Sequence, residues 1–281
     1  THGETVAFPV AAPVLWNAEQ PYLYTLTLQA GVETIEQKVG IRTISVENGK
    51  ILINGKQVKF RGVNRHDSNP YTGATVTRED VIRDLQLMKE SNVNAIRTSH
   101  YPNAPYFPEL CNEYGFYMIA EADLESHGVG TLYTNDGHDC MGYIAQDDAW
   151  AESILDRQKR NVIRDKNQSA VIFWSLGNES GYGGNFEDAG RWVKAYDPTR
   201  LLHYEASIYN SAGYQNDVSM LDVMSRMYAD TEWVKEYCED RRMRKPFIQC
   251  EFIHAMGNGP GDIHDYMELM YKYDKFCGGF V

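Results

Sequence analysis

Two glutamates, each directly after an apolar run typical of a buried strand, are the residues of this chain best suited to chemistry. Glu179 follows the run AVIFWSL at 170–176, and Glu251 follows PFIQC at 246–250. A carboxylate at the end of a buried strand lies at a rim, where a site can form. Two such carboxylates, brought together, can act as acid/base and nucleophile on a glycosidic bond.

Seven successive predicted strand ends carry polar side chains. They are residues 64–67 (NRHD), 97–100 (RTSH), 121–127 (EADLESH), 178–179 (NE), Glu205, Arg226 with Tyr228, and Glu251. One such residue is usually a satisfied core polar group or a loop charge, but seven in succession are hard to attribute to solvation. We expect them to converge on a polyhydroxylated ligand rather than an apolar one.

A carboxylate and an imidazole are paired at Glu125 and His127, which are two residues apart. In an extended segment such residues point to the same side. Together they suit a divalent cation, and an oxygen-rich set with several waters favours Mg²⁺ or Mn²⁺ over zinc. Taken by itself, however, such a pair is more often a hydrogen-bonded Glu–His loop than a metal site, and the same alternative applies to His66 and His100.

The elements that must position these residues alternate between strand-like and helix-like patterns from residue 51 onward. The eight predicted strands are residues 59–64, 94–98, 116–120, 171–174, 201–204, 223–226, 247–250 and 278–281. Thr77 with Asp80 resembles a capping box at the start of the helix after the first of them. No glycine-rich phosphate loop follows that strand, so the pattern favours an α/β fold of the TIM (β/α)8 barrel type over a doubly wound open sheet.

The first 46 residues read as β structure. In 21–28 (PYLYTLTL) the side chains of Tyr22, Tyr24, Leu26 and Leu28 fall on one face, as in a half-buried strand, and 37–44 is its expected antiparallel neighbour. A small hairpin at 50–58 with an Asn54-Gly55 turn follows. Two or three strands cannot close a sandwich. We therefore expect 1–46 to be the last strands of a truncated immunoglobulin-like β-sandwich, and 47–281 to be a barrel cut within strand eight.

Composition narrows the class of protein. The chain has 281 residues, 43% of them hydrophobic and 23% charged, and a net charge of −12, which disfavours nucleic acid as a partner. No apolar run is long enough to cross a membrane. Five cysteines without a C-x-x-C pair indicate a reduced, cytoplasmic protein. Cys250 adjoins Glu251, but no histidine is placed beside it by sequence to make it a nucleophile.

The segments that carry these residues resemble the family 2 glycoside hydrolases, and within them the large bacterial β-galactosidases. The matching segments are 60–66 (FRGVNRH), 94–103 (NAIRTSHYPN), 120–128 (AEADLESHG), 175–181 (SLGNESG), 226–228 (RMY) and 250–258 (CEFIHAMGN). They run in order from one end of the predicted barrel to the other, so the resemblance is specific.

The resemblance implies a retaining hydrolase that removes terminal, non-reducing β-D-galactosyl residues through a covalent galactosyl-enzyme. Glu251 matches the nucleophile, Glu179 the acid/base, and Tyr228 the tyrosine that supports the nucleophile. Mg²⁺ is implied at Glu125, His127 and Glu179, with Mn²⁺ as its substitute and Na⁺ in the full-length protein. The residues that match sugar-binding or transition-state contacts are His66, His100, Asn178, Tyr228 and His254.

The chain also departs from the family pattern. Residues 67–70 (DSNP) replace a more His-rich stretch, and Phe252 stands where a tyrosine is common. The other domains of the family, which supply some sugar and sodium contacts, are absent. We therefore expect the chain by itself to be weakly active or inactive, and its parent to be a homo-oligomer.

Three other functions remain open. A family 2 β-glucuronidase or β-mannosidase would use the same two glutamates on another sugar. A non-catalytic carbohydrate-binding barrel would need neither of them. A metallohydrolase built on Glu125, His127 and His100 would depend strictly on metal.

Overall fold

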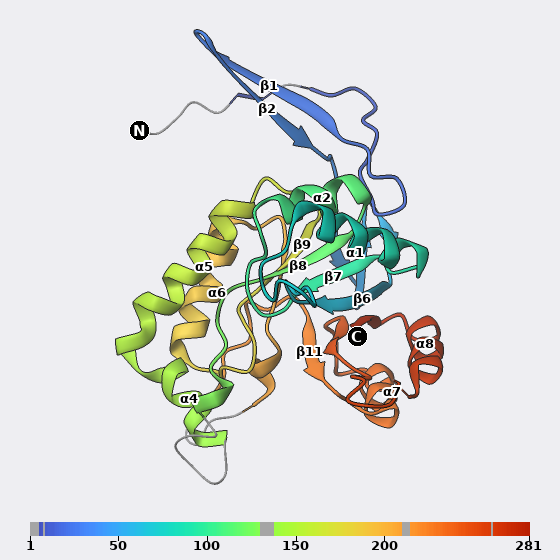
Figure 1. Cartoon of the computed structure of the whole chain (residues 1–281). Helices are drawn as coiled ribbons and strands as arrows, with labels where there is room; N and C mark the ends of the chain where they lie inside the picture. Colours follow the sequence, from blue (N-terminus) through green and yellow to red (C-terminus); the bar gives the residue numbers. More distant parts are fainter. Residues whose placement is uncertain (1–5, 8, 130–137, 210–213, 260) are drawn as a thin grey trace.

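Eight parallel strands form one sheet that curves into a barrel (Figure 1). The computed structural model describes residues 6–7, 9–129, 138–209, 214–259 and 261–281. The barrel strands are β6 (Phe60–Arg65), β7 (Ala95–Thr98), β8 (Tyr117–Glu121), β9 (Val171–Ser175), β10 (Leu201–His203), β11 (Met224–Met227), β12 (Phe247–Glu251) and β13 (Phe276–Phe280). The helices around them are α1 (Arg78–Glu90), α2 (Tyr106–Tyr114), α4 (His138–Gln146), α5 (Ala151–Asp165), α6 (Gly184–Tyr196), α7 (Thr231–Glu239) and α8 (Ile263–Lys272).

The strand order β10-β9-β8-β7-β6-β13-β12-β11 confirms the predicted TIM-type barrel and places its one seam between β10 and β11. Side chains and single backbone contacts join the two edge strands there. The amide of Asp222 donates to the carbonyl of Leu202 at 3.0 Å, and Nε2 of His203 lies 2.7 Å from Oγ of Ser225. The barrel is therefore nearly closed.

The eighth strand was predicted to begin at Gly278, but β13 begins at Phe276. It pairs in parallel with β12 on one side and with β6 on the other. The eighth strand therefore joins the first and seventh strands of the barrel. The other seven strand predictions agree with the structure to within one residue at each end.

Local sequence signals explain the start of helix α1 and the turn of one hairpin. Thr77 and Asp80 form the predicted capping box, with each side chain bonded to the other's backbone N–H, and α1 starts at the next residue. The short hairpin of β4 (Lys50–Ile53) and β5 (Lys56–Gln57) turns at Asn54 and Gly55, which have φ angles of 54° and 74°. Positive φ at both central residues is what a type I′ turn requires, and it favours this Asn-Gly pair.

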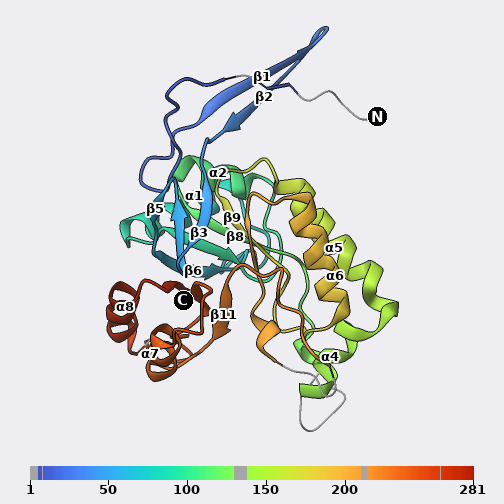
Figure 2. The ribbon, with the colours of Figure 1, turned by 180° about the vertical axis from the view of Figure 1, so that it is seen from behind.

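The N-terminal hairpin of β1 (Tyr24–Ala30) and β2 (Glu33–Val39) is antiparallel and extends away from the barrel (Figures 1 and 2). An antiparallel pair is as predicted, but β1 begins three residues after the predicted start, and the predicted partner 37–44 overlaps β2 only at 37–39. Tyr24 and Leu26 are partly buried, but Leu28 is 53% exposed, so the predicted half-buried face holds only near the base. The outer end has no second sheet to pack on within the described part of the chain. Strand β3 (Ile44–Glu47) pairs with β4 instead, and the domain division at residue 46 stays a prediction.

The apolar residues pack in two clusters. The larger fills the barrel and the space under α1, α2, α5 and α6, with Phe60 on β6 meeting Phe173 on β9 at 5.3 Å between ring centroids. The smaller lies between α7, α8 and strands β12 and β13. In the described residues, no helix is both long and apolar enough to cross a membrane.

Candidate active site

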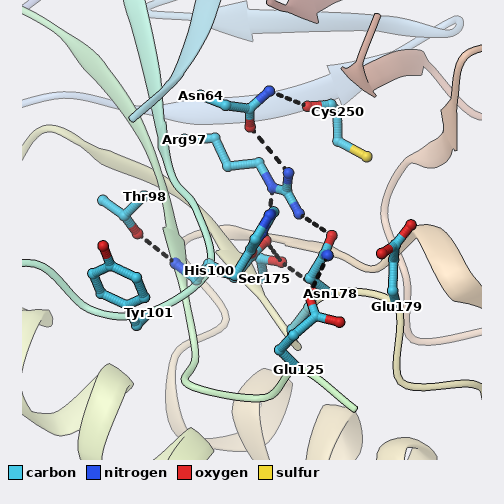
Figure 3. A network of polar contacts seen from close by, with 12 residues as sticks. Asn64, Arg97, Thr98, His100, Tyr101, Glu125, Ser175, Asn178, Glu179 and Cys250 are labelled. Atoms are coloured by element: carbon cyan, nitrogen blue, oxygen red, sulfur yellow. Dashed lines mark hydrogen bonds and ion pairs between the residues drawn. The ribbon is translucent and has the colours of Figure 1, made fainter. Parts of the chain in front are cut away.

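Arg97 on β7 is the centre of a hydrogen-bonded network at the carboxyl ends of the strands (Figure 3). Its side chain is fully buried. Nε donates to Glu121 at 2.7 Å, and Nη1 donates to Glu251 at 2.9 Å and to Asn64 at 3.0 Å. Nη2 donates to Oδ1 of Asn178 at 2.7 Å. One guanidinium therefore connects five strand ends, and it fixes Glu251 and Asn178 relative to each other.

Glu251 ends β12 and has a donor at each carboxylate oxygen. Arg97 reaches Oε1, and the Tyr228 hydroxyl donates to Oε2 at 2.7 Å. Burial raises the pKa of Glu251, but Arg97 and the Tyr228 hydroxyl outweigh it, so the net pKa lies below its ordinary value. Burial and the bond to Glu251 raise the pKa of Tyr228. Glu251 is thus an ionised carboxylate beside a neutral phenol.

Glu179 follows β9 on a turn that requires a glycine at position 177. Gly177 has a φ of 141°, and a Cβ there would lie 2.7 Å from the carbonyl oxygen of Leu124. The missing side chain lets the amide of Asn178 donate to that oxygen at 2.8 Å. Glu179 itself has a φ of 40°, which is uncommon for a residue with a side chain. Such outliers cluster at functional sites.

Both carboxylates act on the phenol of Tyr228, because the charges of Glu251 and Glu179 each raise its pKa. Arg97 bonds both Glu251 and Asn178, the residue before Glu179, so the two glutamates that the sequence singles out lie at the same end of the barrel, although their strands are not adjacent in the sheet.

The predicted metal ligands also meet. Glu125, His127 and Glu179 each offer a donor atom, and these atoms lie within 4.8 Å of one another. Nδ1 of His127 is 2.5 Å from Oε2 of Glu179, and the Asn178 amide donates to Glu125. Burial raises the pKa of Glu125. Two carboxylates and an imidazole with room for water fit Mg²⁺ or Mn²⁺, and the metal stays a prediction.

Four of the five residues predicted to hold the sugar border a cavity of about 270 Å³, and the fifth, Asn178, is not among its lining residues. The cavity is lined by Asn64, His66, Ser99, His100, Tyr228, Glu251, Phe252, His254 and Val281. Nδ1 of His100 is 2.8 Å from Glu121, and its Nε2 is 3.6 Å from Glu251. Burial and the nearby His100 lower the pKa of His66. His254 lies exposed at the edge.

Arg65 and Arg226 are polar strand-end residues that do not join this site. Arg65 points to the helix side, where it pairs with Asp67 at 2.6 Å and Asp84 at 3.0 Å. Arg226 lies over the ring of Trp233 on α7, at 4.5 Å. The expectation that every polar strand end converges is wrong for them, because successive side chains of a strand point to opposite faces.

The structure also places two residues from the departures noted in the sequence, Asp67 and Phe252, and the candidate nucleophile Cys250. Asp67 is held by Arg65, outside the residues that line the cavity. Phe252 is buried against Tyr266, at 5.3 Å between ring centroids, so a ring without a hydroxyl fills its position. Cys250 is buried, and burial raises the pKa of its thiol, which makes it a poor nucleophile. The side chain of Cys140 lies outside the described residues.

The sequence places Arg97, Glu121 and Glu205 among the polar strand ends but gives none of them an individual role. In the structure Arg97 bonds Glu121 and Glu251, and Glu205 bonds the backbone of Glu179. Glu205 follows β10, is 1% exposed, and accepts a hydrogen bond from the backbone N–H of Glu179 at 2.8 Å. Burial raises the pKa of Glu205 to about 8. The available signal is their position at or near the end of a strand, and it does not reveal which strand-end residues face inward.

Family models match nearly the whole length of the chain. Residues 44–281 match the family model "Glycosyl hydrolases family 2, TIM barrel domain", and residues 1–42 match "Glycosyl hydrolases family 2". The chain is 49% identical to a beta-galactosidase of Actinobacillus pleuropneumoniae over 95% of its length, and 46% identical to one of Staphylococcus xylosus over 98%. It spans 29% and 28% of those two relatives.

Among solved structures, the chain is similar to β-D-glucuronidase of Dictyoglomus thermophilum, with a TM-score of 0.68 and 25% identity over 95% of this chain and 52% of that one. It is also similar to a β-glucuronidase of Ruminococcus gnavus, with a TM-score of 0.76 and 22% identity over 96% of this chain and 52% of that one. The second likeness bears on the fold alone.

Proposed function

Because the chain belongs to the glycosyl hydrolases of family 2, we propose that it is the catalytic barrel of a retaining β-galactosidase. The observation that carries the proposal is Glu251, an ionised carboxylate at a polar cavity with Arg97 and Tyr228 on its two oxygens. A nucleophile needs this state, and Glu179 stands close enough for its charge to act on the same phenol.

In the proposed reaction, a Glu251 oxygen attacks the anomeric carbon while the bond to the aglycone oxygen breaks. Glu179 gives its proton to that oxygen, so the aglycone leaves as a neutral alcohol. Glu179, now a carboxylate, then takes a proton from water, whose oxygen attacks the same carbon and frees Glu251. Two displacements retain the configuration at the anomeric carbon.

Two observations favour a galactoside over a glucuronide. The relatives of highest identity cited above are named beta-galactosidases. A glucuronide carries a carboxylate, which proteins usually bind with arginine or lysine, and the described residues that line the cavity include neither. Its histidines, tyrosine and asparagine suit the hydroxyls of a neutral sugar.

A divalent cation, Mg²⁺ or Mn²⁺, would be held by Glu125, His127 and Glu179. When bound, it would contribute positive charge beside the acid/base residue. The metallohydrolase alternative is less well supported, because Nδ1 of His100 lies against Glu121 and His100 is outside this ligand group.

The test compares full-length protein with its Glu251→Gln and Glu179→Gln variants on nitrophenyl β-galactoside and β-glucuronide. We expect turnover of the galactoside with retention, its loss in Glu251→Gln with galactose binding preserved, and a loss of about 10²–10⁴-fold in Glu179→Gln. Glu187→Gln, a buried carboxylate on α6, is the control. Preference for the glucuronide would contradict the substrate, and turnover by Glu251→Gln would contradict the mechanism.

The metal is tested by calorimetric titration with Mg²⁺ and with Mn²⁺. His127→Ala should weaken binding at least about tenfold, whereas His264→Ala, on the exposed face of α8, should leave it unchanged. Equal affinities in both variants would place the metal elsewhere.

A further inference from the structure

Glu205 is a carboxylate at the rim that the two-glutamate reaction does not use. It follows β10 after one residue, Tyr204, and opens the short 3₁₀ turn η2 (Glu205–Ile208). Its side chain is 1% exposed and is not among the residues that line the cavity. Its Oε1 accepts a hydrogen bond of 2.8 Å from the backbone N–H of Glu179. Its contact is therefore with the backbone of the acid/base residue, and not with a sugar in the cavity.

The backbone at Glu179 is one that needs support. Its φ of 40° lies in the left-handed region, where residues with side chains persist only if their surroundings hold them. Two consecutive N–H groups, those of Glu179 and Ser180, point to the end of β10. Glu205 accepts the first, and the hydroxyl of Tyr204 accepts the second at 3.3 Å.

Tyr204 gives this support a rigid base. Its ring stacks on Phe186 of α6, with 4.7 Å between centroids and 6° between planes, and its hydroxyl donates to the carbonyl of Gly181 at 2.8 Å. The segment that carries Glu179 is thus bonded to the end of β10 at three successive residues, 179, 180 and 181. The direction in which the Glu179 side chain leaves the backbone depends on this attachment.

We propose that Glu205 is the positioning residue of Glu179: by accepting its backbone N–H, it holds the acid/base carboxyl where the aglycone oxygen and the attacking water must be. The inference rests on the proposed function, in which Glu179 has that role. Glu251 keeps its own donors, Arg97 and Tyr228, so loss of Glu205 should impair proton transfer and leave the nucleophile in place.

If proton transfer is impaired and the nucleophile is intact, the loss of activity should depend on the leaving group of the substrate. Methyl β-galactoside has a poor leaving group, which needs a proton, whereas 2,4-dinitrophenolate leaves without one. Azide is a nucleophile that needs no base: it attacks the anomeric carbon of the galactosyl-enzyme, the bond to Glu251 breaks, and galactosyl azide forms without proton transfer. A misplaced Glu179 should therefore lower kcat/KM more for the substrate with the poorer leaving group, and azide should restore part of the lost kcat.

The experiment uses full-length protein with Glu205→Leu, which removes the acceptor, and Glu205→Gln, which keeps an acceptor oxygen of the same reach. Glu205→Asp, which withdraws the oxygen by one methylene, replaces the leucine variant if that variant does not fold. Glu187→Leu is the matched control, because Glu187 is also buried, at 5% exposure, and accepts a backbone N–H, that of Asp217, at 2.8 Å.

For Glu205→Leu we expect kcat/KM for methyl β-galactoside to fall by about 10²-fold and that for the dinitrophenyl substrate to fall less than about tenfold. Azide should raise kcat for the dinitrophenyl substrate. Glu205→Gln should retain most of the activity. Glu187→Leu should keep the wild-type ratio of the two kcat/KM values and show no azide effect.

Equal losses on both substrates without rescue by azide would overturn the inference, and so would a Glu205→Gln variant as impaired as Glu205→Leu. If the wild type turns over no β-galactoside, the proposed function fails on its own account. A crystal structure of Glu205→Leu then decides the positioning role: a changed φ at Glu179 with a displaced carboxyl supports it, and an unmoved Glu179 overturns it.

Discussion

Glu251 keeps its charge because donors from two different strand ends reach its two oxygens. Arg97 lies on β7 and Tyr228 follows β11, whereas Glu251 ends β12. Their attraction exceeds the effect of burial, so the pKa of Glu251 is lowered. In the proposed reaction Glu251 attacks only when it is deprotonated, so the rate of turnover should be highest above the pKa of Glu251 and be lost as the pH falls through it.

Tyr228→Phe removes one of these donors and should raise the pKa of Glu251. The acidic limb of the kcat/KM profile for an aryl β-galactoside should consequently move to higher pH, and kcat should fall by about 10–10²-fold. The pH profile of the purified variant measures both. Tyr266→Phe is the control, because its hydroxyl bonds the carbonyl of Ala229 and not the nucleophile. An acidic limb that stays in place would contradict this account of Glu251.

Arg97→Met tests the cost of leaving buried carboxylates without their cation. The variant deprives Glu121 and Glu251 of the guanidinium that pairs with both. Removing one partner of a buried ion pair costs about 3–5 kcal/mol. The free energy of unfolding, measured with denaturant, should therefore fall by that amount. Arg160→Met breaks an ion pair whose arginine side chain is 79% exposed, and its effect should be within about 0.5 kcal/mol. Similar losses in the two variants would contradict the central place given to Arg97.

At the scale of elements, the turn after β9 depends on Gly177. An alanine there has both an unfavourable φ of 141° and a Cβ 2.7 Å from Leu124. Gly55→Ala is the matched control, because Gly55 has a φ of 74° with open space around it. We expect a free-energy loss of about 1–2 kcal/mol for Gly55→Ala and a clearly larger one for Gly177→Ala. Equal losses of unfolding free energy in the two variants, measured by urea denaturation, would mean that Leu124 can move away from the added Cβ without cost.

The sequence predicts the elements well where local signals are strong. The barrel strands are short apolar runs bounded by polar residues, the Asn54-Gly55 pair specifies its hairpin, and Thr77 caps α1. Glu179 and Glu251 stand out by the same logic of strand ends. These signals depend only on neighbours along the chain, which is why one sequence suffices to find them.

Other features depend on contacts between distant segments and leave no local pattern. The seam between β10 and β11 arises from strand pairing around the barrel. The outward direction of Arg65 and Arg226 depends on which face each strand turns inward. The bond from Glu179 to Glu205 joins two strand ends, and neither residue type predicts it. The exposed end of β1 differs from its predicted half-buried face because packing, and not periodicity, determines burial.

For the whole molecule, the segment before the barrel is attached at two points. Trp16 is fully buried, and its Nε1 donates to the carbonyl of Asn112 at 2.9 Å. Gly40 donates to the Ser169 hydroxyl at 2.7 Å, and Arg42 donates to the Ser169 carbonyl at 2.7 Å. Between these points the β1–β2 hairpin extends away from the barrel (Figure 2). The attachment points therefore contribute to barrel stability, and the hairpin between them contributes little.

Replacing residues 24–39 by a short Gly/Ser linker tests this division. Tyr24 and Val39 are paired across the base of the hairpin, so a short linker spans the gap without strain. We expect the melting temperature to stay within a few degrees of the original, because the hairpin's outer apolar residues, such as Leu28 and Ile35, are exposed already. Trp16→Ala, by contrast, removes a buried ring beside Tyr117 and should cost about 3–5 kcal/mol. A linker variant that melts as early as Trp16→Ala would show that the hairpin stabilises the barrel despite its exposure.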